Sequence, residues 1–417
     1  MNVLERDFFT DPEILQDPLP YYRALHERGP VVREPHKGVF MLSRIDEIVE
    51  VYTDHERFSA IVGPLGPLVD LPSPAEGESW SDVIQHRRHE IPMGDQITSL
   101  DPPQHTRHRA LIGKLFTPTR LKENEDFMWA LADGLIDEFA DRGEMEFDRA
   151  YARPFTLLVI ADLLGVPRED HKTFRGWLGG EKGTVGDPEG RHVGDQVFAN
   201  LFPYFAQYIE ERRTSPRDDV MSRLANVRFR DGELPEVMDI VRLTTILFAA
   251  GQETTARLLG AGMRVLCEQP ALAEELRSDP GVIPNFVEEC LRLEGAIKGS
   301  FRLALRDTSL AGVRIPAGSM VMAVIGAANR DPRVFEDPDR FDARRPNAAR
   351  NVAFGHGEHF CPGASLARAE ARISFERLLA RLDDFRLVDP SALSYVETFI
   401  IRGLNRLPLR FRRRSPA

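Results

Sequence analysis

The chain has 417 residues, of which 42% are hydrophobic and 29% charged, a globular composition with enough material for a large core. Its formal net charge of −11 argues against general nucleic-acid binding, which needs a basic surface. Its three cysteines are far apart and include no Cys-x-x-Cys pair, so neither a zinc site nor a disulfide framework is indicated. With no repeat, linker, signal peptide or long apolar run in the sequence, we expect one domain over residues 1–417 of a soluble cytoplasmic protein without a membrane anchor.

The predicted elements give a mainly α fold class with small β-sheets. Apolar residues recurring every three or four positions predict helices at 18–29, 46–52, 121–140, 155–164, 168–178, 193–213, 234–268, 271–277, 285–292 and 366–382. Alternating runs predict β-rich parts at about 31–42, 301–325 and 396–411, the last as a hairpin.

Three segments show neither the helical repeat of three or four residues nor the alternation of a strand. Residues 63–99 are rich in glycine, proline and polar side chains, and so long an irregular stretch is typical of a lid or binding loop. Residues 179–190 are expected to be a flexible connection, and residues 331–351 a meander.

A further helix is predicted to begin at Asp101, with the acid as N-cap, Pro102 at the first helical position and Gln104 at the third. His105 and Arg109 then share one face of that helix. On spacing alone, a solvated polar face is the simpler interpretation of these two residues.

The longest apolar helix, 234–268, is interrupted by Ala250-Gly251-Gln252-Glu253-Thr254-Thr255. Thr254 continues the apolar stripe, and a threonine hydroxyl that bonds to the carbonyl one turn back loosens and bends a helix. The alternative is a tolerated glycine beside a surface glutamate.

The segment 354–363, FGHGEHFCPG, places Cys361 among glycines directly before a predicted helix. Gly355 and Gly357 permit turns that a Cβ would forbid, so the chain can pass close to a flat, bulky group. A helix N-terminus lowers the pKa of a thiol and favours a thiolate ligand. A small buried hydrophobic cysteine is the alternative, and a glycine-rich loop suits it poorly.

In this order, the cysteine segment, the interrupted helix and the pair Glu289-x-x-Arg292 resemble the cytochrome P450 superfamily of soluble bacterial type, over about residues 11–411. The pattern F-x-x-G-x-x-x-C-x-G at 354–363 is similar to the family's haem loop, and the pair alone would indicate little. The resemblance implies the cytochrome P450 fold, a triangular prism with a long central helix over the haem. It also implies a ferredoxin-dependent haem-thiolate monooxygenase that inserts one oxygen atom of O2 into its substrate.

The resemblance also implies the site residues. Cys361 would be the axial thiolate ligand of haem b, which favours O–O cleavage. Thr254 and Glu253 would be catalytic, with the Thr254 hydroxyl hydrogen-bonded to the co-substrate O2 and Glu253 relaying protons from solvent. The other implied haem contacts are the propionate-binding His105, Arg109, Arg302 and His359, together with Ala250, Gly251 (which would leave space for oxygen), Phe354, Gly355 and Gly363. Glu289, Arg292 and Arg345 would form a structural network, with Arg344 as the alternative to Arg345.

By family position, the substrate pocket would be lined by Ile97, Thr98, Phe174, Trp177, Ala249, Ile297, Gly299, Phe399 and Ile400. Any one of them could equally be a core residue. As a set they predict a small-to-medium hydrophobic substrate of terpenoid, steroid, fatty-acid or aromatic type. Lys298, Arg87 and Arg88 could attract a substrate carboxylate, but they are interpreted as solvated charges. The prolines that the family often has after Arg292 are missing here.

Residues 340–377 contain seven arginines and four acids, a local charge of +3 that predicts a docking face for an acidic ferredoxin. Because the chain has no strand–GxGxxG–helix unit, its electrons would come from NAD(P)H through a separate ferredoxin reductase and iron-sulfur ferredoxin. A monomer is expected. A peroxide-using haem-thiolate enzyme and a non-catalytic haem-binding sensor remain open as alternatives, although Glu253 and Thr254 argue against the first.

Overall fold

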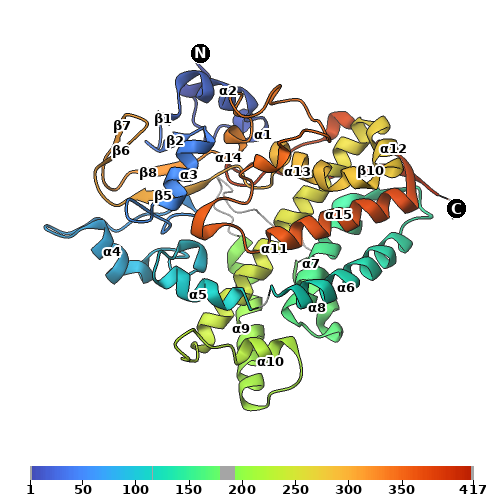
Figure 1. Ribbon diagram of the computed structural model, residues 1–417, viewed down its shortest axis with the longest axis horizontal. Helices are drawn as coiled ribbons and strands as arrows, with labels where there is room; N and C mark the ends of the chain where they lie inside the picture. The colour runs from blue at the N-terminus through green and yellow to red at the C-terminus, as the bar shows by residue number, and fades with distance from the viewer. Residues whose placement is uncertain (1, 115, 179–192, 415–417) are drawn as a thin grey trace.

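The computed structural model describes residues 2–114, 116–178 and 193–414, and its elements are mostly helical (Figure 1). The α-helices are α1 (Pro12–Gln16), α2 (Leu19–Arg28), α3 (Ile45–Thr53), α4 (Trp80–Arg87), α5 (Gln104–Ile112), α6 (Pro118–Asp137), α7 (Arg153–Leu164), α8 (His171–Leu178), α9 (Val193–Thr214), α10 (Val220–Ala225), α11 (Val237–Glu268), α12 (Pro270–Ser278), α13 (Ile283–Glu294), α14 (Ile325–Ala328) and α15 (Ala364–Arg381). The strands are β1 (Val31–Arg33), β2 (Phe40–Leu42), β3 (Phe58–Ser59), β4 (Glu144–Glu146), β5 (Ser300–Ala304), β6 (Thr308–Leu310), β7 (Val313–Ile315), β8 (Met320–Ala323), β9 (Leu382–Leu387) and β10 (Pro408–Arg413). The prediction of a mainly α protein with small sheets is confirmed.

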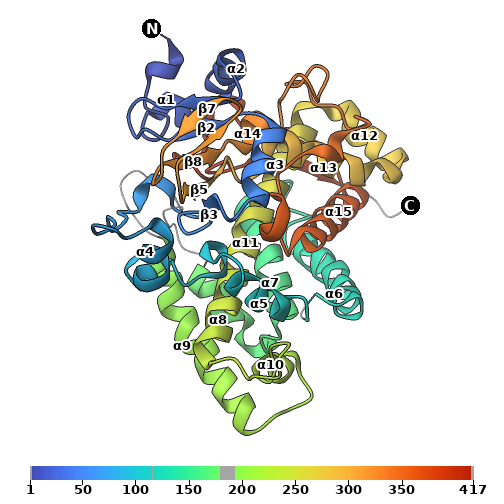
Figure 2. The ribbon, with the colours of Figure 1, turned by 60° about the vertical axis from the view of Figure 1, so that its left-hand side comes forward.

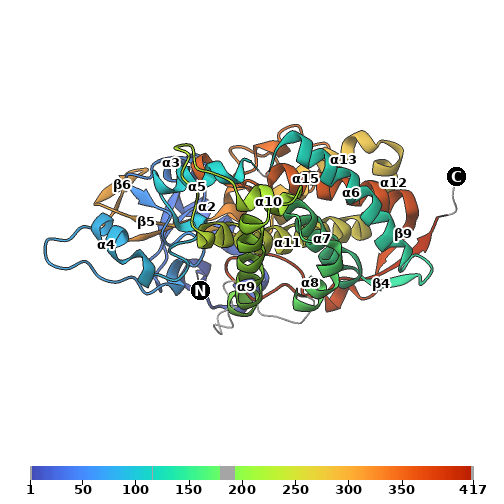
Figure 3. The same cartoon turned by 90° about the horizontal axis from the view of Figure 1, so that it is seen from below.

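Helix α11 runs through the middle of the molecule, between a strand-rich side and a helical side (Figures 1 and 2). Seen from below, the strand-rich side with β5 and β6 lies at one end, and α6, α12 and α15 lie at the other (Figure 3). Among the described residues, no helix is long and apolar enough to cross a membrane.

The largest sheet combines strands from distant parts of the chain, in the order β1-β2-β8-β5-β3. The hairpin predicted at 31–42 is confirmed, since β1 pairs antiparallel with β2 from Val31 opposite Leu42. Strand β2 then pairs in parallel with β8. A three-stranded sheet has the order β4-β10-β9, and β6 and β7 form a separate pair.

The central helix agrees closely with its prediction at 234–268. Glu236 and Asp239 form a capping box at its N-terminus, and it ends before Pro270. Its apolar residues Ile240, Leu243 and Leu247 are buried in the main core, which also contains residues of α6, α7, α13 and α15. Burial on several sides explains why so long a helix is stable here.

Three sequence-based predictions differ from the structure. Residues 63–99 contain the helix α4, whose capping box of Ser79 and Asp82 is readable in the sequence. The hairpin predicted at 396–411 is wrong, because β10 pairs with β9 and β4 and residues 396–407 form only isolated bridges. Strands β4 and β9 and helix α10 were not predicted. The connection predicted at 179–190 lies outside the described residues.

Candidate functional site

The segment around Cys361 is shaped by its glycines. Gly355 and Gly357 have φ angles of 72° and 67°, in the region that favours glycine. A Cβ at Gly357 would lie 2.8 Å from the carbonyl oxygen of Tyr52 on α3, so this glycine is needed for close approach to α3. The Cys361 amide donates to the Phe354 carbonyl at 2.9 Å, and α15 begins three residues later. The cysteine is thereby held at the helix entrance, as predicted.

The electrostatics of the thiol differ from the prediction. Burial raises the pKa of the Cys361 thiol, whereas a hydrogen bond from the Gly363 amide and the charges of Arg109 and Arg368 act in the opposite direction. The expectation that the helix N-terminus alone lowers this pKa is therefore wrong, because desolvation outweighs it. A thiolate here needs a further positive partner.

Four basic side chains from separate elements converge beside this segment: His105 and Arg109 of α5, Arg302 of β5, and His359. The rings of His105 and His359 lie 4.0 Å apart between centroids. Arg109 donates to the carbonyl of Phe360, and Arg302 stacks over the ring of Tyr52 at 4.7 Å. We call these four residues the cation cluster.

The cation cluster has no ion pair with an acid among the residues that the structure describes. Burial, with Arg109 and Arg302 nearby, lowers the pKa of His105 to about 4. Burial and the same arginines lower the pKa of His359 to about 2. In addition, His105 Nδ1 and His359 Nε2 are buried and have no hydrogen-bond partner among the residues that the structure describes. Buried polar atoms of native proteins normally have partners, so this cluster fits an anionic ligand.

Asp101 does not cap α5 as predicted. The N-cap is Pro103, without a side-chain hydrogen bond, and α5 begins at Gln104. The Asp101 carboxylate instead accepts from the Ser59 hydroxyl and, at 2.8 Å, from the Ala60 amide. It therefore ties the start of α5 to the strand β3, which pairs with the strand that carries Arg302.

The predicted threonine bond is present in the middle of α11, which runs without a break from Val237 to Glu268. The Thr254 hydroxyl donates to the Ala250 carbonyl one turn back at 2.8 Å. From α7, the Thr156 hydroxyl donates to the Gln252 carbonyl at 2.9 Å. A Cβ at Gly251 would lie 3.5 Å from Ile160 of α7, so its free side faces α7. The Cys361 segment lies beside α11 in both views (Figures 1 and 2).

Glu253 forms an ion pair that was not predicted. Arg257 Nη2 donates to Glu253 Oε1 at 3.2 Å, and Arg257 Nη1 donates to the Leu404 carbonyl. The spacing Glu253-x-x-x-Arg257 was available in the sequence as an i, i+4 pair. The hydrogen bond from Arg257 to the Leu404 carbonyl could not be predicted from the sequence, because it depends on the tertiary fold.

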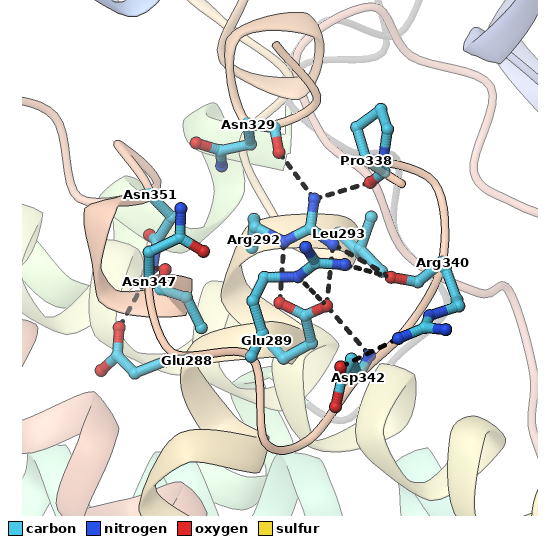
Figure 4. A network of polar contacts seen from close by, with 12 residues as sticks. Glu288, Glu289, Arg292, Leu293, Asn329, Pro338, Arg340, Asp342, Asn347 and Asn351 are labelled. Carbon is cyan, nitrogen blue, oxygen red and sulfur yellow. Dashed lines mark hydrogen bonds and ion pairs between the residues drawn. The ribbon is translucent and has the colours of Figure 1, made fainter. Parts of the chain in front are cut away.

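The structure brings Glu289, Arg292 and Arg345 together in one buried network (Figure 4). Arg292 donates to both carboxylate oxygens of Glu289 at 2.7 Å, and Arg345 Nε donates to Glu289 Oε1 at 2.9 Å. The remaining guanidinium protons of Arg292 reach the carbonyls of Asn329, Pro338 and Arg340. Arg344 lies outside this network and contacts the exposed Glu275 and Asp279.

The predicted pocket residues fall into two groups. Ile97, Phe174, Gly299, Phe399 and Ile400 are buried in the core. Phe174 packs against Trp177, Tyr204 and Phe248, with ring centroids 4.8–5.1 Å away. Residues that keep accessible surface are Thr98, Trp177, Ala249 and Ile297. The pocket lining stays a prediction.

The interpretation of Lys298 as a solvated charge is wrong. Its side chain is buried, and Nζ donates at 2.8 Å to the carbonyls of Leu15 and Thr398. Burial lowers the pKa of Lys298 to about 7. Arg88 is half-buried, and its Nη1 has no partner among the described residues, whereas Arg87 pairs with Glu90 at the surface.

Most arginines of residues 340–377 are paired with acids from elsewhere in the chain. Arg368 contacts Glu288, and Arg372 contacts Glu125 and Glu376. The local charge of +3 therefore overstates the free positive surface. Arg350 is exposed, and no ion pair joins it to an acid in the part of the chain that the structure describes.

The family described as Cytochrome P450 matches residues 191–389. Vitamin D(3) 25-hydroxylase of Pseudonocardia autotrophica is 34% identical over 407 residues, covering 96% of this chain and 95% of that protein. Cytochrome P450 monooxygenase PikC of Streptomyces venezuelae is 34% identical over 420 residues, covering 99% and 94%.

Solved structures of cytochromes P450 are also similar to this chain. The substrate-free form of Mycobacterium marinum cytochrome P450 CYP150A6 is 44% identical, with a TM-score of 0.92 over 99% of this chain and 100% of that chain. CYP109E1 from Bacillus megaterium, in complex with testosterone, is 29% identical, with a TM-score of 0.79 over 94% of this chain and 99% of that chain.

Proposed function

Because the chain belongs to the cytochrome P450 family and is an oxidoreductase of its monooxygenase type, we propose that it inserts one oxygen atom of O2 into a hydrophobic substrate. We propose further that residues 1–417 form one P450 domain that holds haem b. The observation that carries the proposal is the cation cluster, with its two unpartnered imidazole nitrogens, next to Cys361 at the entrance of α15.

The residues present fit a haem group. Its two propionates are the anions that Arg109, Arg302 and the free nitrogens of His105 and His359 can bind by charge-assisted hydrogen bonds. Its iron would be the positive partner that the buried Cys361 thiolate lacks. When bound, the haem would supply redox-active iron, whose thiolate ligand favours O–O cleavage.

The chain's own residues prepare the thiolate. The Gly363 amide donates to Cys361 Sγ, and Arg109 and Arg368 place positive charge near it. The Arg368 guanidinium lies over the Phe354 ring, 4.6 Å from the ring centroid. Phe354 would help to exclude water from the sulfur. These contacts stabilise negative charge on the sulfur in a buried position, where desolvation opposes it.

On the other side of the site, Thr254 and Glu253 would deliver protons. Thr254 Oγ1 donates its proton to the Ala250 carbonyl, so the lone pairs of this oxygen are free to accept a hydrogen bond. Glu253 keeps about a quarter of its side-chain surface accessible, so it can exchange protons with solvent. A hydroxyl next to a carboxylate can carry protons into an apolar site without admitting bulk water.

The substrate is proposed to be a small-to-medium hydrophobic molecule, and the relatives favour a steroid-like one among the terpenoid, steroid, fatty-acid and aromatic types. The named relatives include a vitamin D(3) hydroxylase and a structure with bound testosterone. The partly accessible Trp177, Ala249 and Ile297 would offer apolar surface to such a molecule.

Electrons are proposed to come from an iron-sulfur ferredoxin and its NAD(P)H-driven reductase. Phe360, next to Cys361, is 43% exposed, and Arg350, which has no ion pair with any described acid, precedes the same segment. An exposed aromatic residue beside a cation suits a transient interface with an acidic partner. This face replaces the broader basic face predicted from composition.

The test is turnover with ferredoxin, reductase, NAD(P)H and 18O2, after a steroid and terpenoid panel has been screened for the low-to-high-spin change of the haem spectrum. We expect a product that carries one 18O atom, formed equally well with catalase present. Product that requires added peroxide would favour the peroxide-using alternative. Ligand binding without any product would favour the sensor.

A further inference from the structure

The carboxylate of Glu253 is fixed by a short chain of contacts that ends in the segment 402–404. Arg257 lies one turn further along α11 and donates to Glu253 Oε1 at 3.2 Å. The Arg257 side chain is only 5% exposed, whereas that of Glu253 is 26% exposed. The buried partner is thus the fixed one, and the acid at the edge of solvent is the one that it restrains.

Arg257 is itself held by the backbone of residues 403 and 404. Its Nη1 donates to the Leu404 carbonyl, and a Cβ at Gly403 would overlap with its Cδ. The segment is rigid, because the Arg402 amide donates to the Ala296 carbonyl at 2.8 Å and the Gly403 carbonyl accepts from the Val396 amide at 2.9 Å. A side chain at 403 would displace Arg257 without changing any charge.

A cavity of about 10 Å³, roughly the space of one water molecule, borders Arg257 on its other side and is lined also by Arg264, Glu294, Tyr395 and Arg402. Arg264 and Arg402 both contact Glu294, at 3.2 and 2.8 Å, so that acid is already neutralised. This cavity is too small for the Arg257 guanidinium to move into, and Arg264 and Arg402 in its wall carry like charges. The pairing of Arg257 with Glu253 is therefore the favourable position.

We propose that Arg257 is a positioning residue, which holds Glu253 for proton transfer and is itself set by Gly403 and Leu404. The inference rests on the proposed role of Glu253. An unrestrained glutamate samples several rotamers, whereas proton transfer requires the carboxylate within hydrogen-bond reach of its partner or of one water. Because Arg257 is held by residues 403 and 404, its contact with Glu253 limits the rotamers that this glutamate can adopt.

The test compares Gly403→Ala and Arg257→Gln with Glu268→Gln in the haem-loaded protein. Glu268 is a matched control, because it forms an i, i+4 ion pair with Arg264 on the same helix and is 41% exposed. Crystal structures should show the Glu253–Arg257 pair broken in Gly403→Ala and kept in the control. With ferredoxin and O2, the fraction of electrons lost to peroxide should rise at least twofold in the first two variants. Substrate affinity from the spin change, and product formed with added peroxide, should stay unchanged.

Two results would overturn the inference: an intact pair in Gly403→Ala, or a broken pair with the peroxide fraction of the control. Arg257→Lys should recover part of the coupling, since it keeps a cation beside Glu253, and equal loss in the lysine and glutamine variants would also count against it. If the unaltered protein forms no product from O2, the proposed function fails. The crystal structures still decide whether the segment 402–404 sets the position of Glu253.

Discussion

Two buried groups of charged side chains show how differently one chain can treat its charges. In the Glu289–Arg292–Arg345 network, one carboxylate meets two guanidinium groups, and backbone carbonyls accept most of their remaining protons. The cation cluster of His105, Arg109, Arg302 and His359 has four basic groups and no ion-paired acid among the described residues, and it keeps unpartnered nitrogens. The chain completes the first group by itself, whereas the second would be completed by the proposed anionic ligand.

This difference separates stability from function. A buried ion pair whose hydrogen bonds are satisfied stabilises the fold as long as both partners are present, and removal of one leaves an uncompensated charge. A buried group of like charges lowers the stability of the protein alone and raises its affinity for an anion. We therefore expect substitutions in the two groups to have opposite consequences for the protein without haem.

The largest effect is expected from Glu289→Gln. It leaves Arg292 and Arg345 buried without their carboxylate, and should lower the free energy of unfolding by about 3 to 5 kcal/mol with or without haem. Urea denaturation measures this. Arg344→Gln is the control, since Arg344 is exposed and its surface ion pairs are worth at most about 1 kcal/mol. Equal losses in the two variants would contradict the comparison.

Next in size is Arg302→Gln. Loss of a charge-assisted hydrogen bond, worth about 1.5 to 3 kcal/mol, should speed haem transfer to an excess of a haem-scavenging protein by about tenfold or more. The unfolding free energy of the protein without haem should stay the same or increase, because a buried unpaired charge is removed. Arg107→Gln on α5, where Arg107 pairs with Glu233 and Asp231, should change neither. Strong destabilisation of the haem-free protein would place Arg302 with the network instead.

A smaller effect concerns pH. The folded haem-free protein holds the pKa of His105 at about 4, against 6.5 for an unperturbed histidine, so the unfolded chain takes up the proton first as the pH falls. Stability should therefore fall between pH 6.5 and about 4, by at most about 1.4 kcal/mol per pH unit for this residue. The groups that face it are His359, Arg109, Arg302 and His108.

Urea denaturation of the haem-free protein at pH 7, 6 and 5 gives this dependence, and His105→Gln should flatten it. With haem bound, the slope should be smaller, because the propionates favour the protonated imidazole. An unchanged slope in His105→Gln would show that other groups dominate the acid range.

The smallest effect is expected at the surface, where a charge without an ion-pair partner can be compared with a paired one. Arg350→Glu should lower the rate of ferredoxin-driven reduction a few-fold at low salt, and the difference should vanish at high salt. Arg372→Glu should have less effect, because Glu125 and Glu376 already neutralise Arg372. Stopped-flow reduction rates at two ionic strengths measure both. A larger effect at Arg372 would favour the broad basic face that composition predicted.

Local patterns were enough to predict the elements that carry the site. The apolar spacing of α11, the Thr254 bond to the Ala250 carbonyl and the turn geometry at Gly355 and Gly357 all depend on residues close in sequence. The Glu289–Arg292 pair was also readable, since i, i+3 spacing places both on one helix face. Its complete burial was not.

The predictions that were wrong concern features that depend on the tertiary structure. Whether Arg344 or Arg345 joins Glu289, and why Lys298 is buried, depends on segments dozens to hundreds of residues away. The direction of the Cys361 pKa shift was wrong because burial, which no local pattern shows, outweighs the helix N-terminus. The hairpin predicted at 396–411 failed because β10 finds its partners at 382–387 and 144–146.

The five-stranded sheet has a consequence for the order of folding. Its β2 pairs with β8, so residues 40–42 must wait for residues 321–323, about 280 positions later, before that ladder can close. Closing so long a loop costs chain entropy before any contact compensates for it, and such non-local pairings form slowly. During synthesis, the helices of the middle of the chain can therefore pack first. The sheet that carries Arg302 cannot be completed before β8 has been synthesised, so haem capture by this face would follow the packing of those helices.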